Sequence, residues 1–165
     1  MATETLEKRG QRKGDRFIFH TLGLACTTLS ACAAQALQPD QVKPQGLSRE
    51  QAQQVLEVAL KHEDYKLGKP GVFIDGDLAD ENGNPPHPGY FDFSLGYNDP
   101  KAGATEYWGL FSISTTTGDV WEINSCKRLT GPELKQLQGR IMSRTGKSLG
   151  DEKVQREGLG CDEEQ

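Results

Sequence analysis

The sequence has few of the residues that catalytic and nucleic-acid-binding sites require. It contains three histidines, no Ser-centred G-x-S-x-G turn, and no second histidine or cysteine at zinc-ligand spacing from His87. Beyond the N-terminal segment it has no basic run, and a nucleic-acid-binding protein needs a basic face to displace counterions. We therefore expect no metal, no cofactor, no nucleic-acid partner and no catalytic residue, so the protein is predicted not to be an enzyme.

Two stretches approach known ligand-binding motifs and fail. Residues 145–148, TGKS, match the end of a phosphate-binding loop, but Ile141 stands where its first glycine belongs. The acidic loop 75–89 invites comparison with an EF-hand. Read from Asp75 as its first ligand, it has Pro86 in place of the bidentate glutamate. A solvated loop rich in turn residues is the interpretation we adopt, with an irregular calcium site as the alternative.

The N-terminal segment has the layout of a secretion signal. Basic residues gather in 8–16, and residues 17–34 then run without a permanently ionised side chain. This stretch is too short and too polar for a membrane span, which needs about 20 strongly apolar residues. We therefore predict a signal peptide over 1–34, with Cys26 inside it, and a flexible Gln- and Pro-rich tether over 35–47.

Residues 29–32, Leu-Ser-Ala-Cys, resemble the bacterial lipobox. The resemblance implies lipidation of Cys32 and a lipoprotein anchored in the bacterial periplasm, to the inner or the outer membrane, through the lipid alone. Cleavage after Ala36 without lipidation is one alternative, and a folded N-terminal helix is another. Without the first 31 residues, 14 basic and 21 acidic residues remain, which indicates an acidic surface suited to a basic partner.

Residues 48–147 have the pattern of one α+β domain. Ser48 and Gln51 form a capping box, and apolar residues then recur at helical spacing up to about Glu63. A second helix is predicted after Thr130, with Thr130 as its cap and Pro132 in its first turn. Between the helices we predict about four antiparallel strands, at 71–74, 90–97, 106–114 and 120–124. Helices flanking an antiparallel sheet define the predicted fold, with 148–165 as a loose acidic tail.

The mature part of the chain keeps two cysteines, Cys126 and Cys161. In an oxidising compartment two cysteines most simply form one disulfide, which here would hold the tail against the sheet. A catalytic thiol at Cys126 would need a neighbouring base, for which the sequence offers few histidines.

Partner-binding residues are expected in the acidic loop and among the aromatic residues near it. Loops of this length are uncommon and are often functional, and an aromatic side chain on a polar sheet face often anchors a partner. The predicted contact residues are Asp75, Asp77, Asp80, His87, Tyr90, Trp108 and Trp121. For each tryptophan the competing interpretation is core packing.

The stretch Thr117-Gly118-Asp119-Val120-Trp121 before a closing helix resembles small secreted PepSY or cystatin-like modules. The layout is also similar to NTF2-like immunity proteins. These resemblances imply a non-enzymatic inhibitor, either an immunity protein against a delivered toxin or a peptidase inhibitor. Two alternatives stay open: an envelope hydrolase using carboxylates such as Asp75, Asp77 and Asp92, and a structural envelope lipoprotein with no specific ligand.

Overall fold

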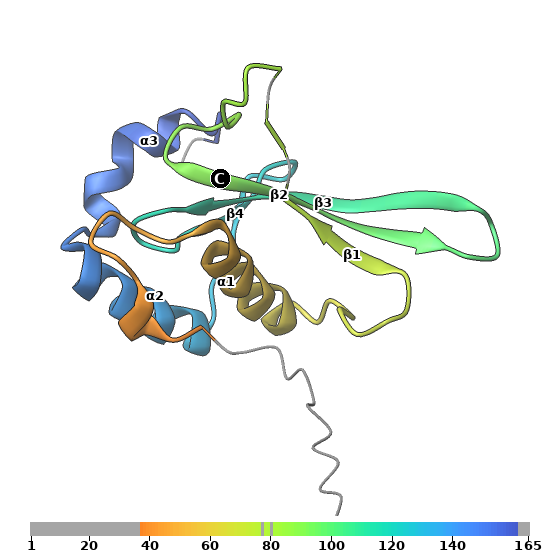
Figure 1. The fold of residues 1–165 in the computed structure, drawn as a ribbon, viewed down its shortest axis with the longest axis horizontal. Coiled ribbons are helices and arrows are strands. Elements are labelled where there is room, and N and C mark those ends of the chain that lie inside the picture. The colour runs from red at the N-terminus through yellow and green to blue at the C-terminus, as the bar shows by residue number, and fades with distance from the viewer. Residues whose placement is uncertain (1–36, 77, 80, 162–165) are drawn as a thin grey trace, which may run out of the picture. The chain divides into compact units, whose positions relative to one another are not determined.

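The computed structural model describes residues 37–161 apart from Asp77 and Asp80. The predicted signal peptide, with Cys26 and Cys32, lies outside the described residues. In the described part, three α-helices and a five-stranded antiparallel sheet confirm the predicted α+β class (Figure 1). No helix in this part of the chain is long and apolar enough to cross a membrane.

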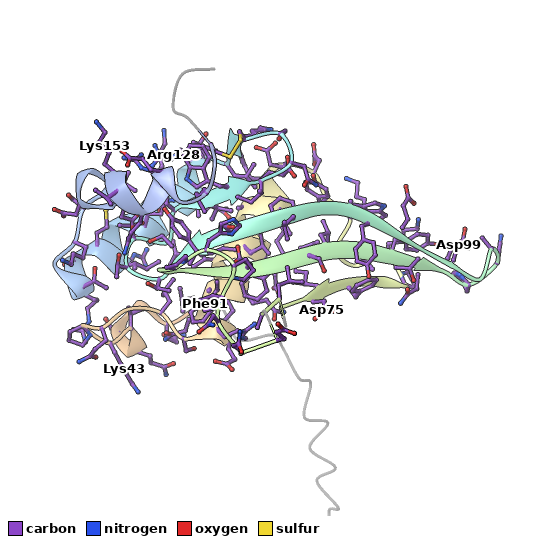
Figure 2. All side chains as sticks on the ribbon, turned by 90° about the horizontal axis from the view of Figure 1, so that it is seen from above. Lys43, Asp75, Phe91, Asp99, Arg128 and Lys153 are labelled. Carbon is purple, nitrogen blue, oxygen red and sulfur yellow. A yellow bond between two sulfur atoms is a disulfide. The ribbon has the colours of Figure 1, made fainter. Side chains whose placement is uncertain are left out.

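The sheet is a meander in which spatial order follows chain order. Its strands are β1 (Val72–Asp75), β2 (Tyr90–Asp99), β3 (Ala104–Ser114), β4 (Val120–Glu122) and β5 (Lys127–Arg128). The two-residue β5 is the strand that the sequence pattern did not predict; it pairs with Trp121 and Glu122 of β4. The long β2–β3 hairpin extends away from the helices and carries Asp99 at its far end (Figure 2).

Helix α1 (Arg49–His62) forms as predicted and supplies much of the core. The Ser48–Gln51 capping box is present and ties down the first turn. One face of the helix is fully buried against the sheet, where Phe93 and Phe111 lie opposite each other on β2 and β3. The buried helix residues are Ala52, Val55, Leu56, Ala59 and Leu60.

Helix α2 (Pro132–Thr145) begins one residue later than predicted. The N-cap is Gly131 and not Thr130, and no side-chain capping bond is present. The reason is that Pro132 occupies the first helical position, where its fixed φ and missing N–H are tolerated, so the residue before it becomes the cap. Gly146 ends the helix with a left-handed φ of 68°, as its sequence position indicated.

The described part of the predicted tether is folded onto the domain. A 3-10 turn, η1 (Pro39–Gln41), leads to Val42 and Leu47, which are both buried in the core. The Leu47 N–H also donates a hydrogen bond to the Thr115 carbonyl at 2.7 Å. The stretch is held in place by three apolar residues, the partly buried Leu37 and the buried Val42 and Leu47. The prediction of a flexible tether over 35–47 is therefore wrong from Leu37 onward.

The C-terminal segment is also ordered, contrary to the predicted loose tail. It forms η2 (Leu149–Glu152) and α3 (Lys153–Glu157) and then returns to the sheet. Leu159 and Cys161 are buried beside Tyr90 and Trp121 in a second, smaller cluster. The polar composition of the segment hides this packing because one buried leucine and one cross-link suffice to anchor it.

Candidate functional site

The two faces of the sheet differ in what covers them. Helices α1 and α2 lie on one face, which we call the inner face, and α3 lies on the other, outer face (Figure 1). Strand register places three rows of side chains on the outer face. They are Phe73–Gly96–Tyr107, then Asp75–Ser94–Leu110, then Asp92–Ser112–Trp121. The first row lies at the open end of this face and the last near the C-terminal segment.

The first row exposes an aromatic pair over a glycine. A Cβ added at Gly96 would lie 2.5 Å from the Phe73 ring, so the ring rests directly on the β2 backbone. Phe73 meets Tyr107 edge to face, with ring centroids 6.2 Å apart. Tyr107 nevertheless remains 69% exposed and, with Val154, is one of two exposed large apolar residues in the described part of the chain.

An irregularity in the β2–β3 register sends Tyr107 outward. The pairing shifts between Leu95 and Gly96, so β3 contains one extra residue at this point. Trp108 consequently lies with Tyr97, and the two rings stack with centroids 5.6 Å apart. The Lys69 ammonium lies 3.5 Å from the Tyr97 ring centroid. Trp108 is thus a partly buried residue packed against the main core, and its neighbour Tyr107 is the exposed one.

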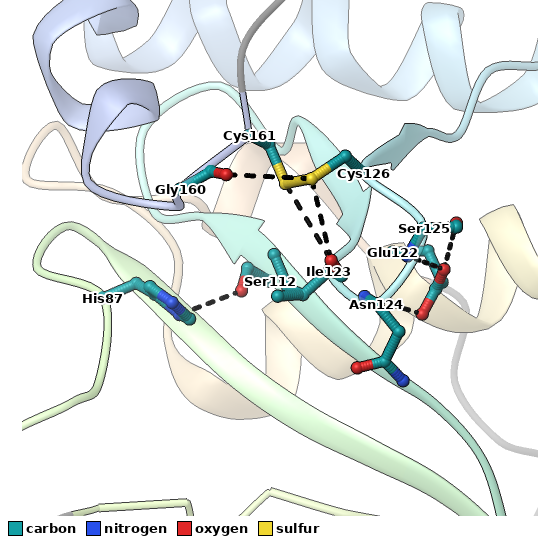
Figure 3. The surroundings of a disulfide bond; sticks show 9 residues. All are labelled: His87, Ser112, Glu122, Ile123, Asn124, Ser125, Cys126, Gly160 and Cys161. Carbon is teal, nitrogen blue, oxygen red and sulfur yellow. Dashed lines mark hydrogen bonds between the residues drawn. A yellow bond between two sulfur atoms is a disulfide. The ribbon is translucent and has the colours of Figure 1, made fainter. Parts of the chain in front are cut away.

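His87 fastens the end of the 76–89 loop to the sheet. Its Nδ1 lies 2.7 Å from Asp92 Oδ1, and its backbone N–H donates to Asp92 Oδ2 at 3.4 Å. Ser112 also donates to the Asp92 carboxylate, which is only 3% exposed. Figure 3 shows the His87 ring directed at Ser112 from the strand side of the loop. Asp92 therefore serves as an internal acceptor that holds loop and sheet together.

The hydrogen bonds among His87, Asp92 and Ser112 differ from those of a nucleophilic triad. In a triad the two ring nitrogens of histidine separate the serine from the carboxylate. Here Ser112 Oγ and Asp92 Oδ1 both face Nδ1, at 3.3 Å and 2.7 Å, and Ser112 donates its proton to Asp92. Because the Ser112 hydroxyl donates to Asp92, His87 is not placed to accept its proton as a general base. The arrangement instead holds the loop in position.

The closed end of the outer face is a buried polar cluster beneath the C-terminal segment. Glu152 is buried and accepts hydrogen bonds from Ser114 Oγ and Thr116 Oγ1. Asp119 accepts from Trp121 Nε1 at 3.0 Å. Burial raises the pKa of Tyr90, and the nearby carboxylates of Glu152 and Asp119 raise it further. This end of the face is therefore filled by the protein's own side chains.

A disulfide closes this end of the sheet. The Sγ atoms of Cys126 and Cys161 are bonded across a sequence separation of 35 residues (Figure 3). Cys126 occupies a turn between β4 and β5 with a positive φ of 52°. The cross-link joins the end of the C-terminal segment to that turn.

A groove of about 530 Å³ lies between α1 and α2, away from the outer face. Its walls carry glutamines and charged residues of both signs, including Glu50, Lys61 and Arg140. The Glu50 carboxylate accepts hydrogen bonds from its own backbone N–H and from the Ser48 hydroxyl, and both lower its pKa. A carboxylate held ionised in this way is a poor proton donor, which disfavours a general acid at this position.

The structure gathers only part of the predicted contact set on an open surface. Asp75 is exposed on the second row and His87 is half-buried at the loop end. Tyr90 and Trp121 are buried, and Trp108 packs on the inner face. These three rings therefore do not form part of an exposed contact surface. The remaining two predicted residues, Asp77 and Asp80, lie outside the described residues.

Sequence reasoning missed the two aromatic residues that do occupy the open end, Phe73 and Tyr107. Trp108 was selected as an aromatic residue of a predicted strand, and the register shift that turns Tyr107 outward instead is not visible in the sequence pattern. A signal was present in Gly96 and Gly109, since glycine inside a strand often marks a bulge or a close contact.

Charge is distributed unevenly along the domain. Residues 72–110, which include β1 to most of β3, contain seven acidic residues and one lysine. Residues 127–156, which include α2 and most of α3, contain eight basic and three acidic residues. In Figure 2, Asp99 and Lys153 mark opposite ends of the molecule's described part. The acidic residues of the domain are therefore concentrated in the β1–β3 part of the chain and the basic residues in the part that forms α2 and α3.

These features define a class: a small acidic α+β domain with one sheet face backed by helices and the other partly open. The model of the family described as "T6SS, Immunity protein Tgi2PP" matches residues 46–153, and the chain belongs to this family. A solved structure of a type VI secretion system effector–immunity complex from Pseudomonas protegens contains a similar chain. That chain is 76% identical, with a TM-score of 0.75, and the match covers 77% of the present chain and 99% of the other.

None of the curated proteins compared with this chain matches it. The family match confirms the coarser part of the predicted resemblance, an immunity-type domain.

Proposed function

We propose that this protein is the immunity partner of a type VI secretion effector and neutralises it by direct binding. The observation that carries the proposal is the family match over most of the folded domain, together with 76% identity to a chain of an effector–immunity complex. A chain this similar to one in such a complex is expected to keep the same kind of partner. On this proposal the protein is an inhibitor that catalyses no reaction.

We further propose that it acts in the periplasm as a lipoprotein anchored through Cys32. The support is the sequence pattern, in which a basic cluster and an uncharged stretch precede Leu29-Ser30-Ala31-Cys32. A disulfide between Cys126 and Cys161 is consistent with an oxidising compartment. An inhibitor held there would meet an effector delivered by a neighbouring cell before the effector reaches its target.

Mass spectrometry of the protein purified from its native envelope tests this location. Lipidation predicts a mature chain that begins at Cys32 with an added lipid mass. Cleavage after Ala36 would instead give an unmodified chain that begins at Leu37. An unprocessed chain recovered from the cytosol would contradict export altogether.

A competition experiment tests neutralisation. A strain that lacks the gene is attacked by its own parent, whose type VI secretion system is active, and we expect the mutant to be outcompeted. Expression of the full chain should restore survival, whereas a version lacking residues 2–31 should not, because it stays in the cytoplasm. Equal survival with and without the gene would refute the proposed function.

The hydrolase alternative receives less support from the geometry. It required Asp75, Asp77 and Asp92 to act as accessible carboxylates in a pocket. Asp92 is buried and accepts hydrogen bonds from Ser112 and from the His87 backbone, and it also contacts the His87 ring. Asp75 stands at the exposed end of a strand. An immunity protein is therefore the function that the observations favour.

A further inference from the structure

We propose that the open end of the outer sheet face is the effector-binding surface, with Tyr107 as its central anchor. This inference rests on the proposed function and adds to it a location and a kind of partner surface. The partner surface would be cationic and would contain a slot for an aromatic side chain. The contact is defined by the Phe73–Gly96–Tyr107 row and by Asp75, the exposed carboxylate of the neighbouring row.

Tyr107 combines exposure with restraint. Residues that dominate binding energy at protein interfaces are most often aromatic or arginine, and they lose little conformational freedom on binding when already held in place. Tyr107 is exposed, yet its ring is fixed against Phe73, which in turn rests on Gly96. Three strands thus support one protruding ring.

The inner face of the same region is already occupied. Lys69 lies over the Tyr97 ring, and Tyr97 stacks on Trp108, so the aromatic residues on that side have partners within the domain. Packing on the inner face stiffens the hairpin while leaving Tyr107 facing outward. A rigid strand-borne ring of this kind suits recognition by a preformed surface.

Charge indicates the chemistry of the occupant. Asp75 is exposed on the row next to this one, and residues 72–110 are strongly acidic overall, with Glu106 in register with Tyr97 on the inner face. A second copy of this chain, bound face to face about a two-fold axis, would set acidic surface against acidic surface. A basic partner would instead be attracted over a distance, which speeds association in a salt-dependent way.

Binding measurements with the purified effector of the Pseudomonas protegens complex test the proposal. The full chain carrying Tyr107→Ala is compared with wild type and with Val154→Ala. Val154 is a matched control, because it is the other strongly exposed large apolar residue among those described and lies on α3. We expect Tyr107→Ala to raise the Kd at least ~30-fold and Val154→Ala to change it less than ~twofold. Circular dichroism and thermal unfolding should be unchanged in both variants, since both side chains are exposed.

A charge variant tests the second half of the proposal. Asp75→Asn should lower the association rate at 50 mM salt about threefold and should reduce its dependence on salt. Glu106→Gln removes the same charge from the inner face and should change both less, which makes it the matched control. Equal effects of Tyr107→Ala and Val154→Ala, with tight wild-type binding, would overturn this surface and leave the proposed function standing. Failure of the wild-type chain to bind would overturn both.

Discussion

The disulfide allows a quantitative prediction about stability. Replacing both Cys126 and Cys161 by serine removes a cross-link between residues 35 positions apart. A loop of this length restricts the unfolded chain enough to stabilise the folded state by about 4 kcal/mol in the chain-entropy model. The cross-link also holds Leu159 against Tyr90 and Trp121, so its loss should loosen that cluster as well.

Urea unfolding followed by tryptophan fluorescence measures this effect, since Trp121 lies in the cluster beside the disulfide. With an m-value of about 2 kcal/mol/M, a loss of about 4 kcal/mol lowers the unfolding midpoint by about 2 M. Reductant should lower the wild-type midpoint by a similar amount and leave the double-serine variant unchanged, which provides the internal control.

A free energy of unfolding for the double-serine variant less than about 1 kcal/mol below that of wild type would contradict this prediction. It would mean that the C-terminal segment is held by its side-chain contacts alone and that the cross-link adds nothing to them.

Two further variants test the buried polar cluster. Tyr90→Phe should change stability by less than about 1 kcal/mol at pH 7, because no described residue hydrogen-bonds to Tyr90 Oη. The pKa of Tyr90 is raised in the folded state, so above about pH 10 the tyrosine ionises first in the unfolded chain and wild type should lose stability. This loss should be smaller in Tyr90→Phe. Unfolding measured at pH 8 and at pH 11 tests both expectations. Glu152→Ala should cost about 1–3 kcal/mol by removing the acceptor of Ser114 and Thr116, and Glu152→Gln should cost less because it keeps an acceptor oxygen. A denaturation midpoint for Glu152→Ala equal to that of wild type would show that these hydrogen bonds add no net stability.

Local patterns were sufficient to predict the regular elements of the domain. The first helix follows from the Ser48–Gln51 cap and five apolar residues at helical spacing, and the structure places both as expected. The central strands follow from alternation and turn residues. These features depend on neighbours within a few positions, so a single sequence contains the information.

Features that depend on contacts between distant segments were missed. Val42 and Leu159 each anchor a segment that looks polar and irregular, and their burial depends on surfaces formed far away in the sequence. The prediction that Trp108 and Trp121 are contact residues failed for a related reason, because contacts with distant segments decide which side chains are exposed. One register shift exchanged the environments of Tyr107 and Trp108, and the C-terminal segment covered Trp121.

The loop ending at His87 illustrates what sequence could and could not indicate. Its turn chemistry and length identified it as a surface loop, which the exposed residues 81–86 support. Its attachment to the sheet through Asp92 was not foreseen, because that carboxylate was expected among candidate reactive groups. A buried acidic residue in a strand is therefore better explained as an internal hydrogen-bond acceptor than as a reactive group.

Hydrogen–deuterium exchange of the full chain, alone and with the Pseudomonas protegens effector, tests whether the open end of the outer sheet face binds the effector. We expect effector binding to slow exchange in residues 94–107 and to leave α3 unaffected. Protection confined to α2 and α3, with the β2–β3 hairpin exchanging as in the free protein, would contradict it.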